Sequence, residues 1–191
     1  MSSAKFDPAR AHCLNAPERE RFLPDARILE LLALTGAETV LDYGAGTGRL
    51  TVPIAAALPA GRVIAVDEHP QMIGHLRSAT AGIANVEVIE IEHNAVPLED
   101  RSVDRVLAAN ILHEVRGEGA LAEIARLLRP TGTLLVLDWE RGRKRDIGPP
   151  DEHLYSLQEA IAELSAAGLA AEAIPADDLP YHFALRAQLS R

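Results

Sequence analysis

The 191-residue sequence predicts an α/β fold in which a mainly parallel, doubly wound sheet is covered by helices. Three observations predict it. Apolar segments typical of strands alternate with amphipathic segments typical of helices. A glycine-rich run follows the first predicted strand directly. Hydrophobic residues make up 48% of the chain and charged residues 25%, which is the composition of an ordinary globular domain with one sizeable core.

Seven segments have the aliphatic and β-branched character of strands. The predicted strands span residues 38–43, 62–67, 86–91, 103–109, 133–138, 170–174 and 181–189. The second is almost wholly apolar until its last residue, Asp67, as expected for a strand buried on both faces. The last two are weak, and periodicity alone does not establish their direction.

Five amphipathic segments are predicted to be helices. They span residues 25–34, 47–58, 70–80, 119–128 and 157–167. Pro53 and Pro70 fall in the early turns of the second and third helices, where proline is tolerated. Pro130 and Gly132 are expected to stop the fourth helix before the fifth strand begins. Residues 1–24 are polar and are predicted to be irregular.

Composition excludes several classes of protein. The net charge of −9 repels a phosphate backbone, so no nucleic-acid partner is expected. Cys13 is the single cysteine, which excludes an intramolecular disulfide and a cysteine-rich metal site and favours a reducing, cytoplasmic compartment. No apolar run reaches the roughly 20 residues of a membrane span. We therefore expect one domain over residues 1–191, with no metal; a homodimer stays open.

The glycine-rich run indicates a ligand-binding turn. Gly44, Gly46 and Gly48 alternate after the first strand, where a tight turn needs residues that adopt positive φ and let a ligand approach the backbone. A dinucleotide fingerprint would have its third glycine where this chain has Arg49. Asp42, two residues before the first glycine, would repel a pyrophosphate. It suits a ligand with positive charge, such as the ammonium and sulfonium of S-adenosylmethionine, better than NAD.

A second acidic residue suits a ribose. Asp67 ends the second predicted strand, 23 residues after Gly44. In doubly wound sheets the acidic residue at this strand end accepts hydrogen bonds from the ribose hydroxyls. Glu68 follows it and either shares that role or is a solvated turn residue.

Five motifs in order carry a family resemblance: VLDYGAGTGRLT, AVDEHPQM, VEVIEIEHNAVPLEDRSVDRVL, ANILHEV and LLRPTGTLLVLDW. With them the chain resembles the class I S-adenosylmethionine-dependent methyltransferases over about residues 20–190. It is most similar to the small-molecule branch that includes the ubiquinone/menaquinone biosynthesis type. The resemblance implies a Rossmann-like seven-stranded sheet of order 3-2-1-4-5-7-6 with an antiparallel last strand and helices on both faces.

The resemblance also implies a cofactor site for S-adenosylmethionine and its product S-adenosylhomocysteine. The implied cofactor-binding residues are Asp42, Tyr43, Gly44, Ala45, Gly46, Asp67, Glu68, Met72, Glu92, His93 and Asn110. Glu92 stands where the family usually has the shorter Asp, whose carboxylate accepts from the adenine amino group. A surface-loop position is the alternative for His93.

The substrate side is expected beyond the fourth and fifth strands, because ligands bind at the carboxyl ends of parallel strands. His113 is the candidate catalytic base, since its unperturbed pKa of about 6.5 suits neutral pH. A structural histidine facing a helix is the alternative. Asp138 faces the substrate or is a strand-end turn residue, and Trp139 walls a pocket or packs in the core.

Residues 140–154 form the candidate substrate loop, and residues 1–36 the N-terminal cap segment and helix. Four cations fall within residues 141–145, which is typical of a solvated loop, a lid, or a docking patch for an anionic substrate or lipid surface. His153 and Tyr155 follow it and are candidates to face the pocket.

The sequence therefore favours methyl transfer to a small-molecule acceptor, achieved mainly by proximity and desolvation. A non-catalytic S-adenosylmethionine-binding subunit is the first alternative. An NAD(P)-dependent oxidoreductase is disfavoured by Asp42, by the glycine spacing, and by the lack of a downstream Tyr-x-x-x-Lys pair.

Overall fold

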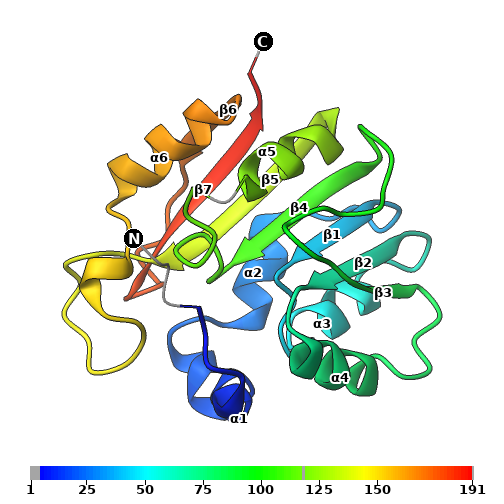
Figure 1. The fold of residues 1–191 in the computed structure, drawn as a ribbon, viewed down its shortest axis with the longest axis horizontal. Helices are drawn as coiled ribbons and strands as arrows, with labels where there is room; N and C mark the ends of the chain where they lie inside the picture. Colours follow the sequence, from blue (N-terminus) through cyan, green and yellow to red (C-terminus); the bar gives the residue numbers. More distant parts are fainter. Residues whose placement is uncertain (1–4, 118, 191) are drawn as a thin grey trace.

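A seven-stranded sheet forms the centre of the computed structural model, which describes residues 5–117 and 119–190 (Figure 1). The strands are β1 (Thr39–Tyr43), β2 (Arg62–Asp67), β3 (Val86–Glu90), β4 (Val103–Ala109), β5 (Leu128–Trp139), β6 (Leu169–Ala173) and β7 (His182–Leu189). Their order is β3-β2-β1-β4-β5-β7-β6. The first five pair in parallel, and β7 is antiparallel to both β5 and β6. The expected topology is confirmed.

Helices cover both faces of this sheet. They are α1 (Ala11–Leu14), α2 (Asp25–Leu32), α3 (Thr51–Ala56), α4 (Pro70–Ala79), α5 (Ala120–Leu127) and α6 (Leu157–Ala166), with short 3₁₀ turns η1 (Pro8–Arg10), η2 (Pro17–Arg21) and η3 (Asp151–His153). One face packs against α2, α3 and α4, and the other against α5 and α6. In the described part of the chain, no helix is long and apolar enough to cross a membrane.

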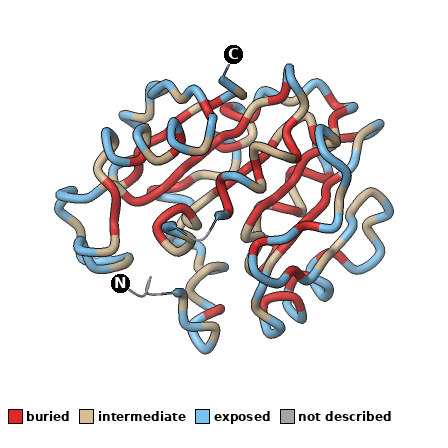
Figure 2. The backbone as a smooth tube through the Cα atoms, turned by 45° about the horizontal axis from the view of Figure 1, so that its top comes forward, coloured by how far each residue is buried: buried red, intermediate tan, exposed pale blue. Residues whose placement is uncertain are grey.

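The buried strands separate two apolar cores (Figure 2). Val40 and Val63 face the core under α2, α3 and α4, whereas Leu41 and Ile64 face the core under α5 and α6. Successive residues of a strand point to opposite faces, so both must be apolar in a sheet covered twice. Tyr43 and Asp67 are the last residues of β1 and β2. Because these two strands are parallel, both residues lie at the carboxyl ends of the sheet's strands.

The polar composition of the N-terminal segment predicted irregular structure, and this prediction is wrong. The segment contains η1, α1 and η2 over the part that the structure describes. Pro8 and Pro17 stand at the starts of η1 and η2, where the missing N–H has no helical partner to lose. Asp7 caps η1 by accepting a hydrogen bond from the Ala9 N–H at 3.0 Å. Segments this short carry no periodicity that a sequence pattern could detect.

Two other predicted boundaries are wrong. The second helix begins at Thr51 instead of residue 47, because Gly48 has φ +83° and keeps the glycine turn out of the helix. The strand predicted at 133–138 begins at Leu128, which pairs with Val103 across a register shift in β4. Pro130 lies within this strand at the irregularity, where a missing N–H is tolerated.

Glu38 closes the turn that leads into β1. Its carboxylate accepts hydrogen bonds from the Thr35 N–H and hydroxyl, both at 2.7 Å, and from the N–H groups of Gly36 and Ala37. Burial by itself would raise the pKa of Glu38, but these hydrogen bonds outweigh it and lower the pKa to about 2. The charged form is therefore the one that the fold stabilises.

We expect Glu38→Gln to lower the free energy of unfolding by about 1–3 kcal/mol at pH 7, because it removes charge-assisted hydrogen bonds from a buried turn. A depressed folded-state pKa stabilises the protein above the unfolded value near 4.5, and this stabilisation is lost as the pH falls toward 2. Urea denaturation of both proteins between pH 7 and pH 3 measures the difference. A difference that does not shrink with falling pH would contradict this account.

Candidate functional site

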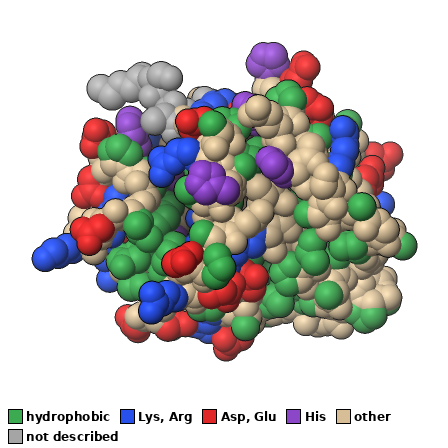
Figure 3. All heavy atoms as spheres, turned by 90° about the horizontal axis from the view of Figure 1, so that it is seen from below, with side chains coloured by type: hydrophobic (Ala, Val, Ile, Leu, Met, Phe, Trp, Pro, Cys, Tyr) green, Lys and Arg blue, Asp and Glu red, His purple; other side chains and the backbone are tan. Residues whose placement is uncertain are grey.

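A cavity of about 730 Å³ opens where the strands β1, β2, β4 and β5 end. Its floor comes from residues at these strand ends, and its cover comes from the N-terminal segment and from residues 146–150. Apolar side chains show in a hollow between acidic and basic ones on the face drawn in Figure 3. Of the predicted site residues, the cavity brings together Asp42, Tyr43, Gly44, Ala45, Gly46, Asp67, Glu68, Met72, Asn110 and His113.

The glycine turn is bound to the end of β2. The N–H groups of Gly44 and Ala45 both donate to the Val66 carbonyl at 2.9 Å. Gly44 has φ +74°, and a Cβ there would lie 2.7 Å from Cγ1 of Ile111. Glycine is required at this position both for its backbone conformation and for the close approach of the segment after β4.

Asp67 joins the turn to the mouth of β2. Its Oδ2 accepts the Gly46 N–H at 2.8 Å, and its Oδ1 accepts the His69 N–H at 2.9 Å. Burial raises the pKa of Asp67, although both hydrogen bonds oppose this. Each carboxylate oxygen accepts more than one hydrogen bond, so Asp67 keeps capacity for a vicinal diol in the cavity.

Asp42 is a second buried carboxylate beside the turn. It is 3% exposed, and its Oδ2 accepts the hydroxyl of Thr51 at 2.6 Å. Burial, with a further contribution from the charge of Asp67, outweighs the hydrogen bond from Thr51 and raises the pKa of Asp42 to about 6. A positively charged ligand in the cavity would stabilise the ionised form of both groups.

These residues fit S-adenosylmethionine. Gly44 and Gly46 border the cavity, Asp67 offers acceptors for ribose hydroxyls, and Asp42 offers a negative charge for an ammonium group. The fit depends on donor chemistry: two acidic groups would repel a pyrophosphate and attract a cation.

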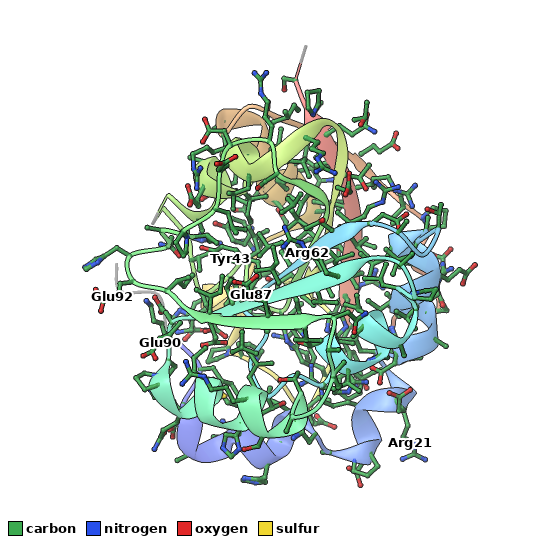
Figure 4. All side chains as sticks on the ribbon, turned by 90° about the vertical axis from the view of Figure 1, so that its right-hand side faces the viewer. Arg21, Tyr43, Arg62, Glu87, Glu90 and Glu92 are labelled. Carbon is green, nitrogen blue, oxygen red and sulfur yellow. The ribbon has the colours of Figure 1, made fainter. Side chains whose placement is uncertain are left out.

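Glu92 and His93 lie apart from the main cavity. Both are exposed and line a smaller hollow with Lys5 and Glu68. Figure 4 shows Glu92 at the margin of the molecule beyond β3, with Tyr43 in its interior. The Tyr43 hydroxyl donates to Oδ1 of Asn94 at 2.8 Å. Asn94 was missed in the sequence, although Asn tolerates the positive φ of +62° that it adopts.

His113 is held by a buried carboxylate. Its Nδ1 donates to Oδ1 of Asp138 at 2.7 Å, and its backbone N–H donates to Oδ2 at 3.0 Å. With Nδ1 protonated, the lone pair is on Nε2, which lies 3.8 Å from Oε1 of Glu114. Burial by itself would lower the pKa of His113, but Asp138 and Glu114 outweigh it and raise the pKa. Asp138 thus binds His113 and is not a solvated turn residue.

Asn110 is positioned by a histidine that the sequence gave no signal for. The Nε2 of His182 donates to Oδ1 of Asn110 at 3.0 Å. His182 is fully buried, and burial lowers its pKa to about 3, so the ring is neutral. It packs against Trp139, with ring centroids 4.5 Å apart. Asn110 has φ +57°, and the bond orients its amide at the cavity wall.

Three of the four cations in the basic run after β5 form ion pairs. Arg141 pairs with Glu159 at 2.6 Å, Arg143 with Glu140 at 2.7 Å, and Arg145 with Asp151 at 2.7 Å. These pairs hold the loop in a folded arrangement. Residues 146–150 line the cavity, and a Cβ at Gly148 would lie 3.0 Å from the Trp139 ring. The loop is therefore a wall of the cavity.

Known proteins resemble this chain in sequence and fold. Residues 40–132 match a family described as a methyltransferase domain. A solved SAM-dependent methyltransferase from Aquifex aeolicus is 30% identical, with a TM-score of 0.89, over 97% of this chain and 100% of that chain. An uncharacterized methyltransferase of Mycobacterium bovis is 38% identical over 68% of this chain and 52% of its own length. The ubiquinone/menaquinone biosynthesis C-methyltransferase of Syntrophotalea carbinolica is 34% identical over 58% of this chain and 47% of its own length.

The chain belongs to the class I S-adenosylmethionine-dependent methyltransferases. S-adenosylmethionine is the cofactor of that family, in agreement with the residues that line the cavity. The match spans about half the length of the two curated relatives named above.

Gly44→Ala is expected to destabilise the protein by roughly 2–4 kcal/mol, because a positive φ costs Ala about 1 kcal/mol and the contact with Ile111 adds to it. Gly82→Ala is the matched control, since Gly82 has φ +80° and nothing within 4 Å of an added Cβ. Chemical denaturation of both variants isolates the cost of the close approach. Equal losses in the two variants would show that Ile111 does not constrain the turn.

His113 is expected to titrate above its ordinary value near 6.5, and Asp138→Asn is expected to lower that pKa, since the neutral amide stabilises the imidazolium less. Nuclear magnetic resonance of the histidine Cε1 protons measures both titrations. Asp177→Asn, at an exposed turn, is the control and should leave His113 unchanged. A His113 resonance that Asp138→Asn does not move would refute the pairing.

Proposed function

We propose that this chain transfers the methyl group of S-adenosylmethionine to a small-molecule acceptor. The observation that carries the proposal is one cavity bordered by the glycine turn with Asp42 and Asp67 and by His113. Membership of the family supports methyl transfer as the type of reaction. The small-molecule acceptor and the roles of individual residues are our inference.

The cofactor would be held by the residues that border β1 and β2. Asp67 accepts from the ribose hydroxyls, with Glu68 beside it, and Asp42 lies near the ammonium group. Met72 offers an apolar contact, and the amide of Asn110 is available at the methionine end. Glu92 and His93 serve the adenine only if the adenine extends into the smaller hollow that they line.

The sulfonium supplies a methyl group that is already activated, so the chain mainly has to orient the acceptor and exclude water. The N-terminal segment and residues 146–150 line the cavity and narrow its access to solvent. His113 accepts a proton at Nε2 from an acceptor that arrives protonated, and Asp138 stabilises the imidazolium that results.

The cover favours a small acceptor over a macromolecule. A cavity of about 730 Å³ is within the range of small-molecule sites, and two segments of the chain line it opposite the strand ends. The His113–Asp138 pair favours an enzyme over a subunit that only binds the cofactor. Transfer of a labelled methyl group to a library of small acceptors tests this. Cofactor binding without transfer to any acceptor would favour the non-catalytic subunit.

Asp67→Ala is expected to raise the dissociation constant of S-adenosylhomocysteine roughly 5- to 150-fold, which corresponds to about 1–3 kcal/mol for two ribose hydroxyls left without an acceptor. Isothermal titration calorimetry measures it. Glu90→Ala is the matched control, since Glu90 pairs in register with Asp67 at the end of β3 but does not line the cavity. Unchanged affinity in Asp67→Ala would overturn the ribose assignment.

A further inference from the structure

Arg19 is a cation built into the cover of the cavity. It lies in η2, and its backbone carbonyl accepts the N–H groups of Phe22 at 3.1 Å and Leu23 at 2.7 Å. Its side chain lines the cavity. Arg21 is two residues further along the same turn, does not line the cavity, and extends away from the molecule in Figure 4.

Arg19 forms no ion pair among the residues that the structure describes, although the charge of Asp25 acts on it and opposes the lowering of its pKa. Its Nε is buried without a hydrogen-bond acceptor, and no described carboxylate forms an ion pair with it. Neighbouring arginines differ: Arg49 pairs with Glu20 and Asp25, both at 2.6 Å, and Arg145 pairs with Asp151. Burial and the charge of Arg49 lower the pKa of Arg19 to about 10, so it stays cationic at neutral pH.

The surroundings of Arg19 are apolar and aromatic. Its guanidinium carbon lies 5.8 Å from the centre of the Phe22 ring, and that ring lies 5.6 Å from Trp139. Ile147 and Pro149 line the same cavity from the loop after β5. A partly desolvated cation beside apolar walls suits a ligand with one anionic group and an apolar body.

Asp42 and Asp67 border a different part of the cavity from Arg19, although the lining also holds other charges of both signs: Lys5, Asp7, Arg10, Glu18, Arg49, Glu68, Glu114 and Asp146. Asp42 and Asp67 belong to β1 and β2, whereas Phe22 and Trp139, beside Arg19, belong to the cover and to the end of β5. In the sheet, β4 separates β1 from β5. The acidic side suits a cationic cofactor. The side with Arg19 is therefore available to an anionic acceptor.

We propose that Arg19 binds a carboxylate group of the acceptor, whose apolar body lies against Phe22, Trp139 and Ile147. This inference rests on the proposed function, because it assigns the substrate class of the same cavity. A guanidinium offers two parallel N–H donors that match both oxygens of a carboxylate, which gives orientation as well as attraction. Arg19 thereby selects small carboxylic acids over their neutral analogues.

The test titrates benzoate, phenylacetate and decanoate, each against its primary amide, into the protein saturated with S-adenosylhomocysteine. At least one carboxylate is expected to bind tenfold or more tightly than its amide. Arg19→Gln should abolish this preference and leave the affinity for S-adenosylhomocysteine within twofold of the original. Arg21→Gln is the matched control and should behave as the unmodified protein does.

Thermal unfolding separates binding from a structural role. Arg19 has no ion pair to lose, so Arg19→Gln should melt no lower than Arg21→Gln. A lower melting temperature together with lost binding would assign a structural role and overturn the proposal.

Two other outcomes overturn it as well. Carboxylates that bind no better than their amides show that the cavity does not select the anion. A tenfold loss of S-adenosylhomocysteine affinity in Arg19→Gln, with carboxylate binding intact, shows that Arg19 serves the cofactor. If the unmodified protein does not bind S-adenosylhomocysteine, the proposed function fails separately, and the same titrations on the free protein still decide the role of Arg19.

Discussion

The hydrogen bond between the Gly46 N–H and the Asp67 carboxylate joins the two strand ends on which the cavity depends. Together with the bonds from Gly44 and Ala45 to the Val66 carbonyl, it holds the glycine turn against β2. This turn also leaves space for Ile111, which follows β4. Ile111 lies so close to Gly44 that a side chain at position 44 would collide with it. One short turn therefore sets how the segments after β1, β2 and β4 meet.

The ionisable groups in the cavity wall differ in how fully hydrogen bonds and opposite charges compensate them for their burial. Asp42 has one hydroxyl donor, and His113 has the carboxylate of Asp138. Arg19 forms no ion pair with a described residue. Incomplete compensation of a buried charge costs free energy, and a ligand of complementary charge recovers part of that cost. The pattern of incomplete compensation is therefore informative about the ligands.

The cover of the cavity is made by segments far apart in the chain. Phe22 follows η2, Trp139 ends β5 and His182 begins β7, and the three rings lie within about 6 Å of one another. Ion pairs inside residues 140–159 fold the basic run onto itself. Three of the cations that resemble a docking patch in the sequence are thereby paired, and residues 146–150, which follow them, line the cavity.

Sequence alone determined the fold class, the glycine turn and the acidic residues at the ends of the first two strands, because these depend on local patterns: apolar runs, glycine spacing and distance along the chain. Tertiary structure alone decided that Asp138 binds His113, that His182 orients Asn110, and that Arg19 lies without an ion pair in the described cavity wall. Such pairings join residues tens of positions apart, and β7 reaches its place only through sheet pairing. Burial and long-range contact, which set the charge state of these groups, have no local signature.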